Sequence, residues 1–255
     1  MPRPKGIRPL RRNELPTDTV ALARYLIGKT LVHDLPQGRI SGRIVETEAY
    51  LPDDAACHAF RGPTPRNRAL FLERGHSYVY FIYGSTFMLN VSSQPAGIGA
   101  GILFRAVEPL EGIELMQQRR PHAKLSELTR GPGRLATAFW IDRNQDGLDL
   151  CAAGPLWLGA AVKRPGKPIG VSVRIGITQD AHRLLRFYEQ GSPFVSGPKS
   201  LNTPPPPAKA RSRAPSAAAA GSIVKVPRIA TSGRPTVAGS GKAGATKRPA
   251  RPRAH

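Results

Sequence analysis

The sequence predicts one α+β domain with a mostly antiparallel sheet, followed by a basic tail that has no core. Strand-like segments are joined by hairpin-length turns as often as by helices, which favours an antiparallel sheet. The composition changes sharply after Gly197, because the rest of the chain has 12 Lys or Arg, no Asp or Glu and no aromatic residue. The 255 residues therefore suit a domain of roughly 200 residues plus an extension.

Each expected element has a local signal. A helix is expected over 17–28, where Thr17 or Asp18 provides the N-cap and Gly28 ends it. A second helix should begin near Pro109, with the proline in its first turn, and a third should follow the GPG at 131–133. The second helix should run to about Arg119. The expected strands are 29–34, 39–50, 76–83, 86–93, 101–107, 155–159 and 170–177.

The domain boundaries follow from charge and composition. We expect a basic N-terminal arm at 1–9, a folded domain at 10–197 and a disordered tail at 198–255. The tail is rich in Pro, Ala, Gly, Ser and cations, so it cannot bury enough apolar surface to offset its ordering entropy. Its charge leaves two roles open, a non-specific grip on a polyanion or a solubilising extension.

The net charge of +21 and the pI near 11.1 predict an anionic partner, either nucleic acid or an acidic membrane surface. No apolar run approaches the roughly 18–20 residues needed to span a membrane, and the basic N-terminus has no apolar segment behind it. Cys57 and Cys151 lack the spacing of a metal site or a disulfide framework. We therefore expect a reducing compartment, no membrane partner, no metal and no cofactor.

The strand GRIVETEAY places Glu46, Glu48 and Tyr50 on one face. Carboxylates are poor strand formers, so two on one face need a reason. One interpretation is a solvated face paired with cross-strand arginines such as Arg43. The other is a general base at the wall of a cleft, where a carboxylate of tuned pKa activates water.

The stretch YVYFIYG contains three of the six tyrosines. Tyr83 precedes Gly84 between two expected strands, which predicts a hairpin tip and a ring that can wedge between bases. Tyr50 and Tyr80 could instead hold a planar ligand between them. Asn90, in an otherwise apolar strand, is either a satisfied core residue or a reader of a polar ligand edge.

Basic residues follow the ETEAY strand in the turn RGPTPRNR. Arg66 and Arg68 lie within three residues after Pro65, and their guanidinium forks match the geometry of phosphate oxygens. His58 lies just before this turn. The turn is therefore a candidate contact for a nucleic-acid backbone.

Seven blocks carry a family resemblance. VETEAY, TPRNR, YVYFIYG, MLNVSS, LFRAVEPLEG, GPGRL and RFYEQGSPFVS occur in this order, and together they resemble the alkyladenine (3-methyladenine) DNA glycosylase family over residues 10–197. The resemblance implies a curved sheet flanked by helices, with a protruding hairpin that inserts into double-stranded DNA. It implies a monomer that flips damaged purines such as 3-methyladenine, 7-methylguanine or hypoxanthine into a pocket. The location would be the bacterial cytoplasm at the nucleoid, or a eukaryotic nucleus.

The resemblance also implies roles for individual residues. Glu48 would be the general base, with Arg105 and the backbone carbonyl of Ile175 helping to hold the attacking water. Tyr83 would be the intercalating wedge, and Ser85 after it replaces a bulkier residue of the family. The base pocket would comprise Tyr50, His58, Tyr80 and Asn90, and the phosphate contacts Arg66, Arg68 and Arg134.

The motifs contain no lysine or N-terminal proline placed to form a Schiff base, so we expect a monofunctional enzyme that leaves an abasic site. Two alternatives stay open. One is a non-catalytic basic protein that binds nucleic acid through charge and aromatic rings alone. The other is a sugar hydrolase that uses Glu46 and Glu48 as an acid–base pair, although two residues on one strand face could not flank a sugar from opposite sides.

Overall fold

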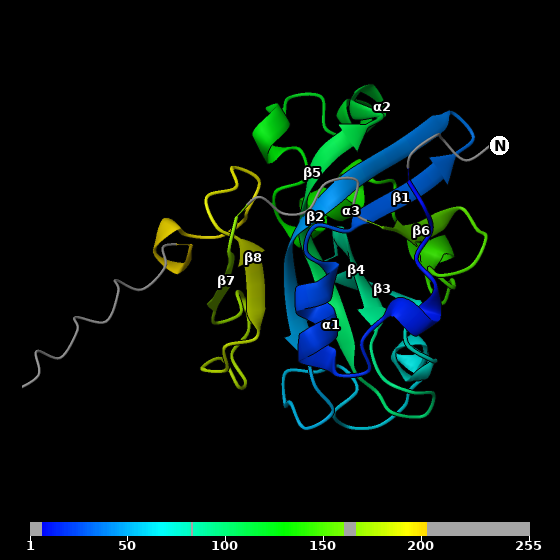
Figure 1. Cartoon of the computed structure of the whole chain (residues 1–255), viewed down its shortest axis with the longest axis vertical. Coiled ribbons are helices and arrows are strands. Elements are labelled where there is room, and N and C mark those ends of the chain that lie inside the picture. The colour runs from blue at the N-terminus through cyan, green and yellow to red at the C-terminus, as the bar shows by residue number, and fades with distance from the viewer. Residues whose placement is uncertain (1–6, 83, 161–166, 203–255) are drawn as a thin grey trace, which may run out of the picture. The chain divides into compact units, whose positions relative to one another are not determined.

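The computed structural model describes residues 7–82, 84–160 and 167–202, and within them it confirms a mixed α+β domain built on an antiparallel sheet (Figure 1). The strands are β1 (Thr30–Leu35), β2 (Gly38–Tyr50), β3 (Ser77–Ile82), β4 (Thr86–Ser92), β5 (Gly101–Glu111), β6 (Leu156–Gly159), β7 (Ile169–Ser172) and β8 (Arg186–Glu189). The α-helices are α1 (Thr19–Leu26), α2 (Ile113–Arg119) and α3 (Pro132–Ala138). Short 3-10 helices occupy Arg12–Glu14, Arg68–Phe71, Leu125–Glu127, Arg143–Gln145 and Lys199–Leu201.

Strand β2 organises the sheet. The strand order is β3-β4-β5-β2-β1-β6, and β8 joins β2 while β7 joins β8. β5 pairs along one edge of β2, while the other edge is shared by β1 at residues 38–43 and β8 at residues 46–48. The second half of β2 thereby leaves β1 for a different neighbour, and the sheet curls around this point as a half-barrel (Figure 1).

Three irregularities interrupt the pairing of β2 with β5, and two of them flank Glu46. Ile44 pairs with Val107 and Glu46 with Ala106, so Val45 is passed over; the next pair is Thr47 with Phe104, so Arg105 is passed over in turn. Such bulges bend a strand and redirect side chains, and they are common beside active sites. Glu46, Glu48 and Arg105 therefore converge at the most distorted part of the sheet.

The helices cover the sheet and complete the core. Asp18 caps α1, because its carboxylate accepts a hydrogen bond from the Ala21 amide at 2.7 Å. α1 packs on β2, and α3 packs on β4 and β5 (Figure 1). Fully buried apolar side chains from these elements form one continuous core. The core gives the strands that carry the polar site a rigid support.

Two of the expected elements need correction, and one further strand was not predicted. The second helix begins at Ile113 and not near Pro109, because β5 continues to Glu111 and Pro109 pairs opposite Gly42. The chain turns only at Gly112, whose φ of 69° suits glycine. β7 ends at Ser172, short of the predicted 170–177, and β8 was not expected. Pairing with β2 fixes the end of β5 and the position of β8, and pairing with β8 fixes β7, so tertiary contacts override local propensity.

The hairpin of β3 and β4 pairs Ser77 with Val91 through Ile82 with Thr86. The Ser85 amide donates to the Ile82 carbonyl, and Gly84 has a φ of 65°, which closes a tight turn. Tyr83, the expected wedge, lies outside the described residues. So do the tail after 202 and residues 1–6 of the expected arm.

The described domain continues past Gly197, since Lys199–Leu201 form a 3-10 helix. Arg8 and Leu10, near the N-terminus, exchange backbone hydrogen bonds with Ala160 and Leu158 beside β6. None of the helices in the described ranges is long and apolar enough to cross a membrane.

Candidate active site

A cavity of about 330 Å³ opens on one face of the curled sheet. It is bounded by β3, β4 and β5, by residues 56–58, and by residues 175–177. Six of the predicted site residues line it: Tyr50, His58, Tyr80, Asn90, Arg105 and Ile175. Its volume is at the lower end of the range of about 300–1,000 Å³ typical of small-ligand pockets. The structure thus brings most of the predicted site together around a space for one small, flat molecule.

Glu48 is fully buried behind the cavity wall that its hydrogen-bond partners form. Its Oε1 accepts from the Ile175 amide at 2.8 Å and lies 3.1 Å from Arg105 Nη1. Its Oε2 accepts from the Tyr50 hydroxyl at 3.0 Å. Tyr50, Arg105 and Ile175 all line the cavity, so the carboxylate is held directly next to it.

Burial raises the pKa of Glu48, while Arg105 and the Ile175 amide oppose the rise. The nearby charge of Glu46 adds to the increase. A carboxylate whose pKa is raised toward neutrality is a better proton acceptor, which is the property a general base needs. The amide of Ile175 donates to this carboxylate, and the role expected for the carbonyl of Ile175, to hold the attacking water, stays a prediction.

Glu46 has different surroundings, although it too is fully buried. Its Oε1 accepts from Arg105 Nε at 2.8 Å, Arg186 Nε at 2.7 Å and the Ser196 hydroxyl at 2.9 Å. Its Oε2 accepts from the Ser196 amide at 2.6 Å. Burial alone would raise the pKa of Glu46, but the two arginines and the Ser196 amide outweigh it and lower the pKa.

This arrangement decides between the two interpretations of the ETEAY strand. Neither carboxylate faces solvent, so the expectation of a solvated face is wrong; Arg43 instead pairs with Glu108 and Glu189. A low pKa and four donors also make Glu46 unsuitable as a proton donor. An acid–base pair of Glu46 and Glu48 is therefore not supported.

Aromatic rings form the wall opposite the carboxylate. The His58 and Tyr80 ring centroids lie 4.5 Å apart in an edge arrangement, and Tyr78 stacks on Tyr80 at 5.4 Å. His58 Nδ1 lies 2.9 Å from the Tyr78 hydroxyl, which fixes the imidazole plane. Burial lowers the pKa of His58, and Arg66 lowers it further, so the ring is neutral at physiological pH.

Alternation along β3 divides its side chains between two faces of the sheet. Tyr78, Tyr80 and Ile82 line the cavity, whereas Val79 packs in the core on the other face. Phe81, also on that other face, is 45% exposed near the end of the strand. The first two tyrosines are therefore part of the pocket.

Asn90 lies on β4, opposite Tyr78 on one side and Leu103 on the other. Its side-chain nitrogen donates to the Tyr78 carbonyl at 3.2 Å, and the residue is buried at the cavity wall. The two roles expected for Asn90, a hydrogen-bonded core residue and a residue at the ligand site, are therefore compatible. Asn90 is hydrogen-bonded within the sheet and also lines the pocket.

Sequence reasoning missed the residues that hold Tyr50. The Arg174 guanidinium lies over the Tyr50 ring at 4.6 Å from its centroid and donates to the Ala49 carbonyl at 3.0 Å. Arg174 is also paired with Asp54, and both side chains are fully buried. No motif identified the Arg174–Asp54 pair. The only signal in the sequence is that Asp53 and Asp54 follow closely after ETEAY. The Arg174–Asp54 pair therefore packs against the Tyr50 ring and holds it in place.

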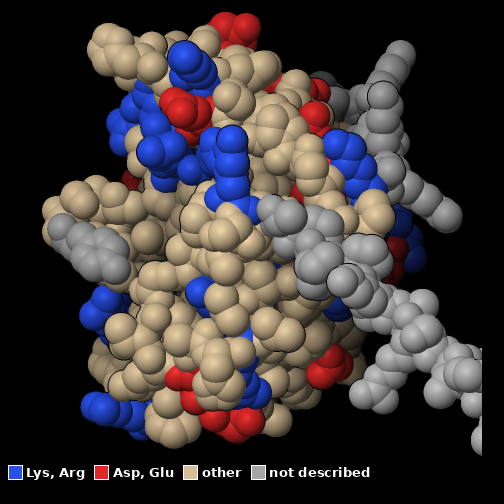
Figure 2. Space-filling model, turned by 90° about the vertical axis from the view of Figure 1, so that its left-hand side faces the viewer, with Lys and Arg blue, Asp and Glu red and all other residues tan. Residues whose placement is uncertain are grey.

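The predicted phosphate contacts lie outside this cavity. Arg66 lines a shallow depression with Phe81, Phe87 and Arg143, and Arg68 is exposed at the start of its 3-10 helix. Arg134 lines a groove with Arg120 and Arg130, next to Thr86 of the β3–β4 hairpin. Figure 2 shows Lys and Arg side chains gathered on the upper part of one face. The described residues contain no group of three His, Cys, Asp or Glu suited to hold a metal ion.

Comparison with known proteins confirms the resemblance. The model of the family described as methylpurine-DNA glycosylase (MPG) matches residues 13–193. A protein of Mesorhizobium japonicum with the provisional name 3-methyladenine DNA glycosylase is 66% identical over 76% of this chain and 92% of its own length. The DNA-3-methyladenine glycosylase of Homo sapiens is 44% identical over 69% of this chain and 64% of its own length. The chain therefore belongs to the methylpurine-DNA glycosylase family, and it is an enzyme of the DNA-glycosylase class.

Proposed function

We propose that this enzyme is a monofunctional glycosylase that removes alkylated or deaminated purines from double-stranded DNA and leaves an abasic site. The substrates would be bases of the 3-methyladenine, 7-methylguanine and hypoxanthine type. One observation carries the proposal. The Glu48 carboxylate, whose pKa is raised, contacts Tyr50, Arg105 and Ile175, and all three of these residues line the aromatic cavity.

The cavity accounts for base recognition. A base can enter it only after leaving the helix, which costs a few kcal/mol of unstacking and unpairing. Stacking against an aromatic ring returns about 1–3 kcal/mol per base, and Tyr50 and Tyr80 supply such rings. We assign Tyr83, which follows β3 in the sequence, to fill the space left in the helix. Asn90 would discriminate against the 2-amino group of normal guanine.

The reaction breaks the bond between C1′ of the sugar and the base nitrogen, and the bonding electrons leave with the base. The sugar becomes cationic in the transition state, as in glycoside hydrolysis, and the Glu48 carboxylate stabilises this charge. A water oxygen then bonds to C1′ while Glu48 accepts its proton. Arg105 favours the ionised form of Glu48 and, with the carbonyl of Ile175, would hold the water.

The leaving base determines whether a second proton is needed. A base alkylated at N3 or N7 is already cationic and departs neutral. Hypoxanthine must gain a proton, yet burial lowers the pKa of His58 and raises that of Cys57 to about 11. The side chains of His58 and Cys57 are thus poor proton donors near neutrality. Protonation from solvent would therefore set the pH dependence for neutral lesions.

DNA binding would depend on the strong positive charge of the chain. Arg66, Arg68 and Arg134 lie outside the base cavity, where backbone phosphates flanking a flipped nucleotide would pass. The net charge of +21 favours such contacts on a single protein molecule. We assign double-stranded DNA as the partner and a monomer as the acting species.

The test is release of free base from a duplex that contains one hypoxanthine or one 3-methyladenine analogue, at enzyme in excess over DNA. Free base and an alkali-labile abasic site are expected from the damaged strand only. The matched undamaged duplex is the control. Binding of damaged DNA without release of any base would refute the proposal and favour a non-catalytic binding protein.

A further inference from the structure

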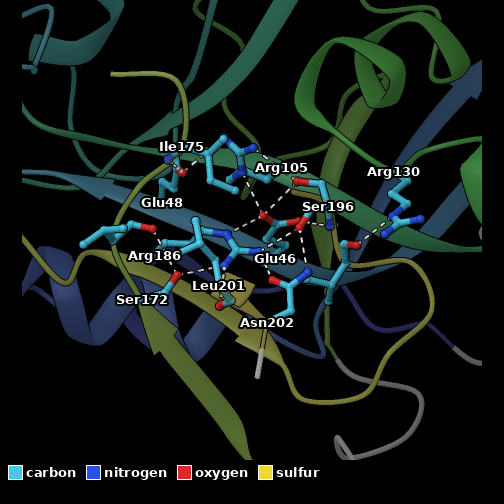
Figure 3. Close-up of polar contacts among 12 residues, drawn as sticks. Glu46, Glu48, Arg105, Arg130, Ser172, Ile175, Arg186, Ser196, Leu201 and Asn202 are labelled. Atoms are coloured by element: carbon cyan, nitrogen blue, oxygen red, sulfur yellow. Dashed lines mark hydrogen bonds and ion pairs between the residues drawn. The ribbon is translucent and has the colours of Figure 1, made fainter. Parts of the chain in front are cut away.

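The segment Ser196–Asn202 contacts the buried carboxylate of Glu46 and its partner Arg186, although it follows the residues 13–193 that the family model matches. Figure 3 shows Ser196, Leu201 and Asn202 around Arg186 and Glu46, with Arg105 and Glu48 on the far side of Glu46. We call Ser196–Asn202 the C-terminal clasp. The clasp has no role assigned so far, and it lies against the buried charged residues next to Glu48.

We propose that Glu46, Arg186 and the C-terminal clasp form a positioning unit that fixes Arg105 against Glu48 and thereby sets the proton affinity of the catalytic base. The inference rests on the proposed role of Glu48. None of these groups touches the substrate in this proposal; all act through Arg105.

The first step is the guanidinium of Arg105, each nitrogen of which has its own contact. Nη1 lies 3.1 Å from Glu48 Oε1, whereas Nε donates to Glu46 Oε1 at 2.8 Å and Nη2 donates to the Ser196 hydroxyl at 3.2 Å. A guanidinium is planar, so fixing two of its nitrogens fixes the direction of the third. Glu46 and Ser196 therefore determine how Arg105 meets Glu48.

The second step is the anchor of Glu46 and Ser196. Arg186 is fully buried, and its Nε donates to Glu46 Oε1 at 2.7 Å. Its Nη2 donates to the Ser196 carbonyl at 2.9 Å and to Asn202 Oδ1 at 2.7 Å. The Asn202 amide nitrogen returns a bond to the same Ser196 carbonyl at 3.0 Å. Asn202 thus locks the clasp onto Arg186 and keeps Ser196 against Glu46.

The third step is the charge of the unit. Glu46 and Glu48 are balanced by Arg105 and Arg186, and all four side chains are at most 6% exposed. In so dry a setting, a small displacement of one charge changes the energies of the others strongly. If Arg105 moves away from Glu48, the ionised form of Glu48 loses its nearest cation and the base becomes protonated more easily. The clasp would therefore control activity through the ionisation of Glu48.

Two mild substitutions test the clasp without changing any charge. Asn202→Ala removes the lock on Arg186, and Ser196→Ala removes the hydroxyl between Arg105 and Glu46. Glu108→Gln is the matched control, because it breaks the partly exposed Arg43–Glu108 pair between the same two strands. Each full-length variant is measured for single-turnover excision of a hypoxanthine-containing duplex, for DNA affinity, and for the Glu48 titration by carbon-13 carboxyl NMR.

We expect both clasp variants to slow excision by about 10- to 100-fold, the cost of a small misplacement at a reacting centre. DNA affinity should stay unchanged and the Glu48 titration should move to higher pH. Glu108→Gln should leave all three unchanged. A lower melting temperature with unchanged excision and an unchanged Glu48 titration would overturn the inference and leave the clasp a structural element only. If the parent protein releases no base, the proposed function fails, but the Glu48 titration still decides the inference.

Discussion

Glu46 and Glu48 are two residues apart on β2, and both are fully buried, yet their surroundings give them opposite chemistry. Two arginines and both polar groups of Ser196 hold Glu46, which lowers its pKa. Glu48 has one arginine and lies behind the cavity wall, so burial raises its pKa. When the surroundings shift the pKa values of two neighbouring carboxyl groups in opposite directions, the group with the raised pKa is the candidate for proton transfer. The other one supports the structure.

The largest effect should come from Glu48→Gln. This change keeps the shape of the pocket but removes the proton acceptor and the negative charge. Excision should fall by about 10²–10⁴-fold, the range attributed to a positioned acid or base, while lesion DNA binds as before. Single-turnover assays and equilibrium binding on the same duplex separate the two quantities. Excision within tenfold of the parent would transfer the base role to another residue.

Glu46→Gln should instead lower stability more than any substitution at Glu48. A neutral amide leaves Arg105 and Arg186 short of one buried countercharge and places an NH₂ group against donors. Breaking a buried ion pair from one side costs about 3–5 kcal/mol in the free energy of unfolding. Glu48→Gln should cost less, because burial already favours its neutral form. Denaturant unfolding of both variants makes the comparison, and equal losses would contradict it.

The two carboxylates should also respond to pH in opposite directions. The lowered pKa of Glu46 gives stability that is present above its unfolded pKa and is lost as pH falls through the folded pKa. The raised pKa of Glu48 gives stability that is present below its unfolded pKa and is lost as pH rises through the folded pKa. The proposed mechanism needs Glu48 ionised, so it predicts that excision of 7-methylguanine rises with pH.

The midpoint of that rise should lie above the ordinary glutamate value of about 4.3. Hypoxanthine excision should show the same acid limb and also fall on the alkaline side, because the neutral base must be protonated to leave. Single-turnover rates for both lesions across the pH range test this. An acid midpoint at or below the ordinary value would show that Glu48 is not the titrating base.

The sequence predicted the residues that line the pocket much better than the buried residues that hold them in place. Tyr50, Tyr80, Asn90 and Arg105 occur within family motifs and His58 lies between two of them, and the structure places all five around one cavity. The antiparallel sheet and the first helix also followed from local periodicity. These features are encoded over short spans, where alternation and caps give a readable signal.

The support is encoded over long distances, and local patterns do not reveal it. Arg186 and Ser196 meet Glu46 across about 140 residues or more, through β8, which was not expected. The bulge that passes over Arg105 likewise depends on how β2 and β5 pair. Pro109 resembled the first turn of a helix because local propensity favours it, but pairing with β2 keeps it in the sheet.

Asn90 extends the comparison to a buried polar residue that lines the cavity. Its side-chain nitrogen donates a hydrogen bond within the sheet. Replacing Asn90 therefore removes only this bond but changes the shape of the pocket wall. Asn90→Ser should let undamaged guanine enter more often, with a loss of discrimination of roughly 1–3 kcal/mol. Release of guanine from undamaged duplex, relative to hypoxanthine release, measures the change. Guanine release equal to that of the parent would remove Asn90 from the specificity filter.

The smallest effect on catalysis should come from removing the residues after Asn202, whereas removal after Gly197 also deletes Leu201 and Asn202, which contact Arg186. The 11 Lys and Arg residues after Asn202 carry charge but no predicted core residues. If four of them meet phosphates, truncation there should reduce the slope of log K against log salt by roughly 3.6, at about 0.9 per phosphate.

This loss should be the same for damaged and undamaged duplexes, and saturating single-turnover excision should be unchanged. The shorter protein ending at Gly197 should show the same loss of salt slope and, in addition, slower excision, because the clasp no longer holds Arg186. The pair of truncations therefore separates charge from positioning. Equal excision rates for the two would show that Leu201 and Asn202 do not support the base, and equal salt slopes for full-length and truncated protein would show that the tail does not grip DNA.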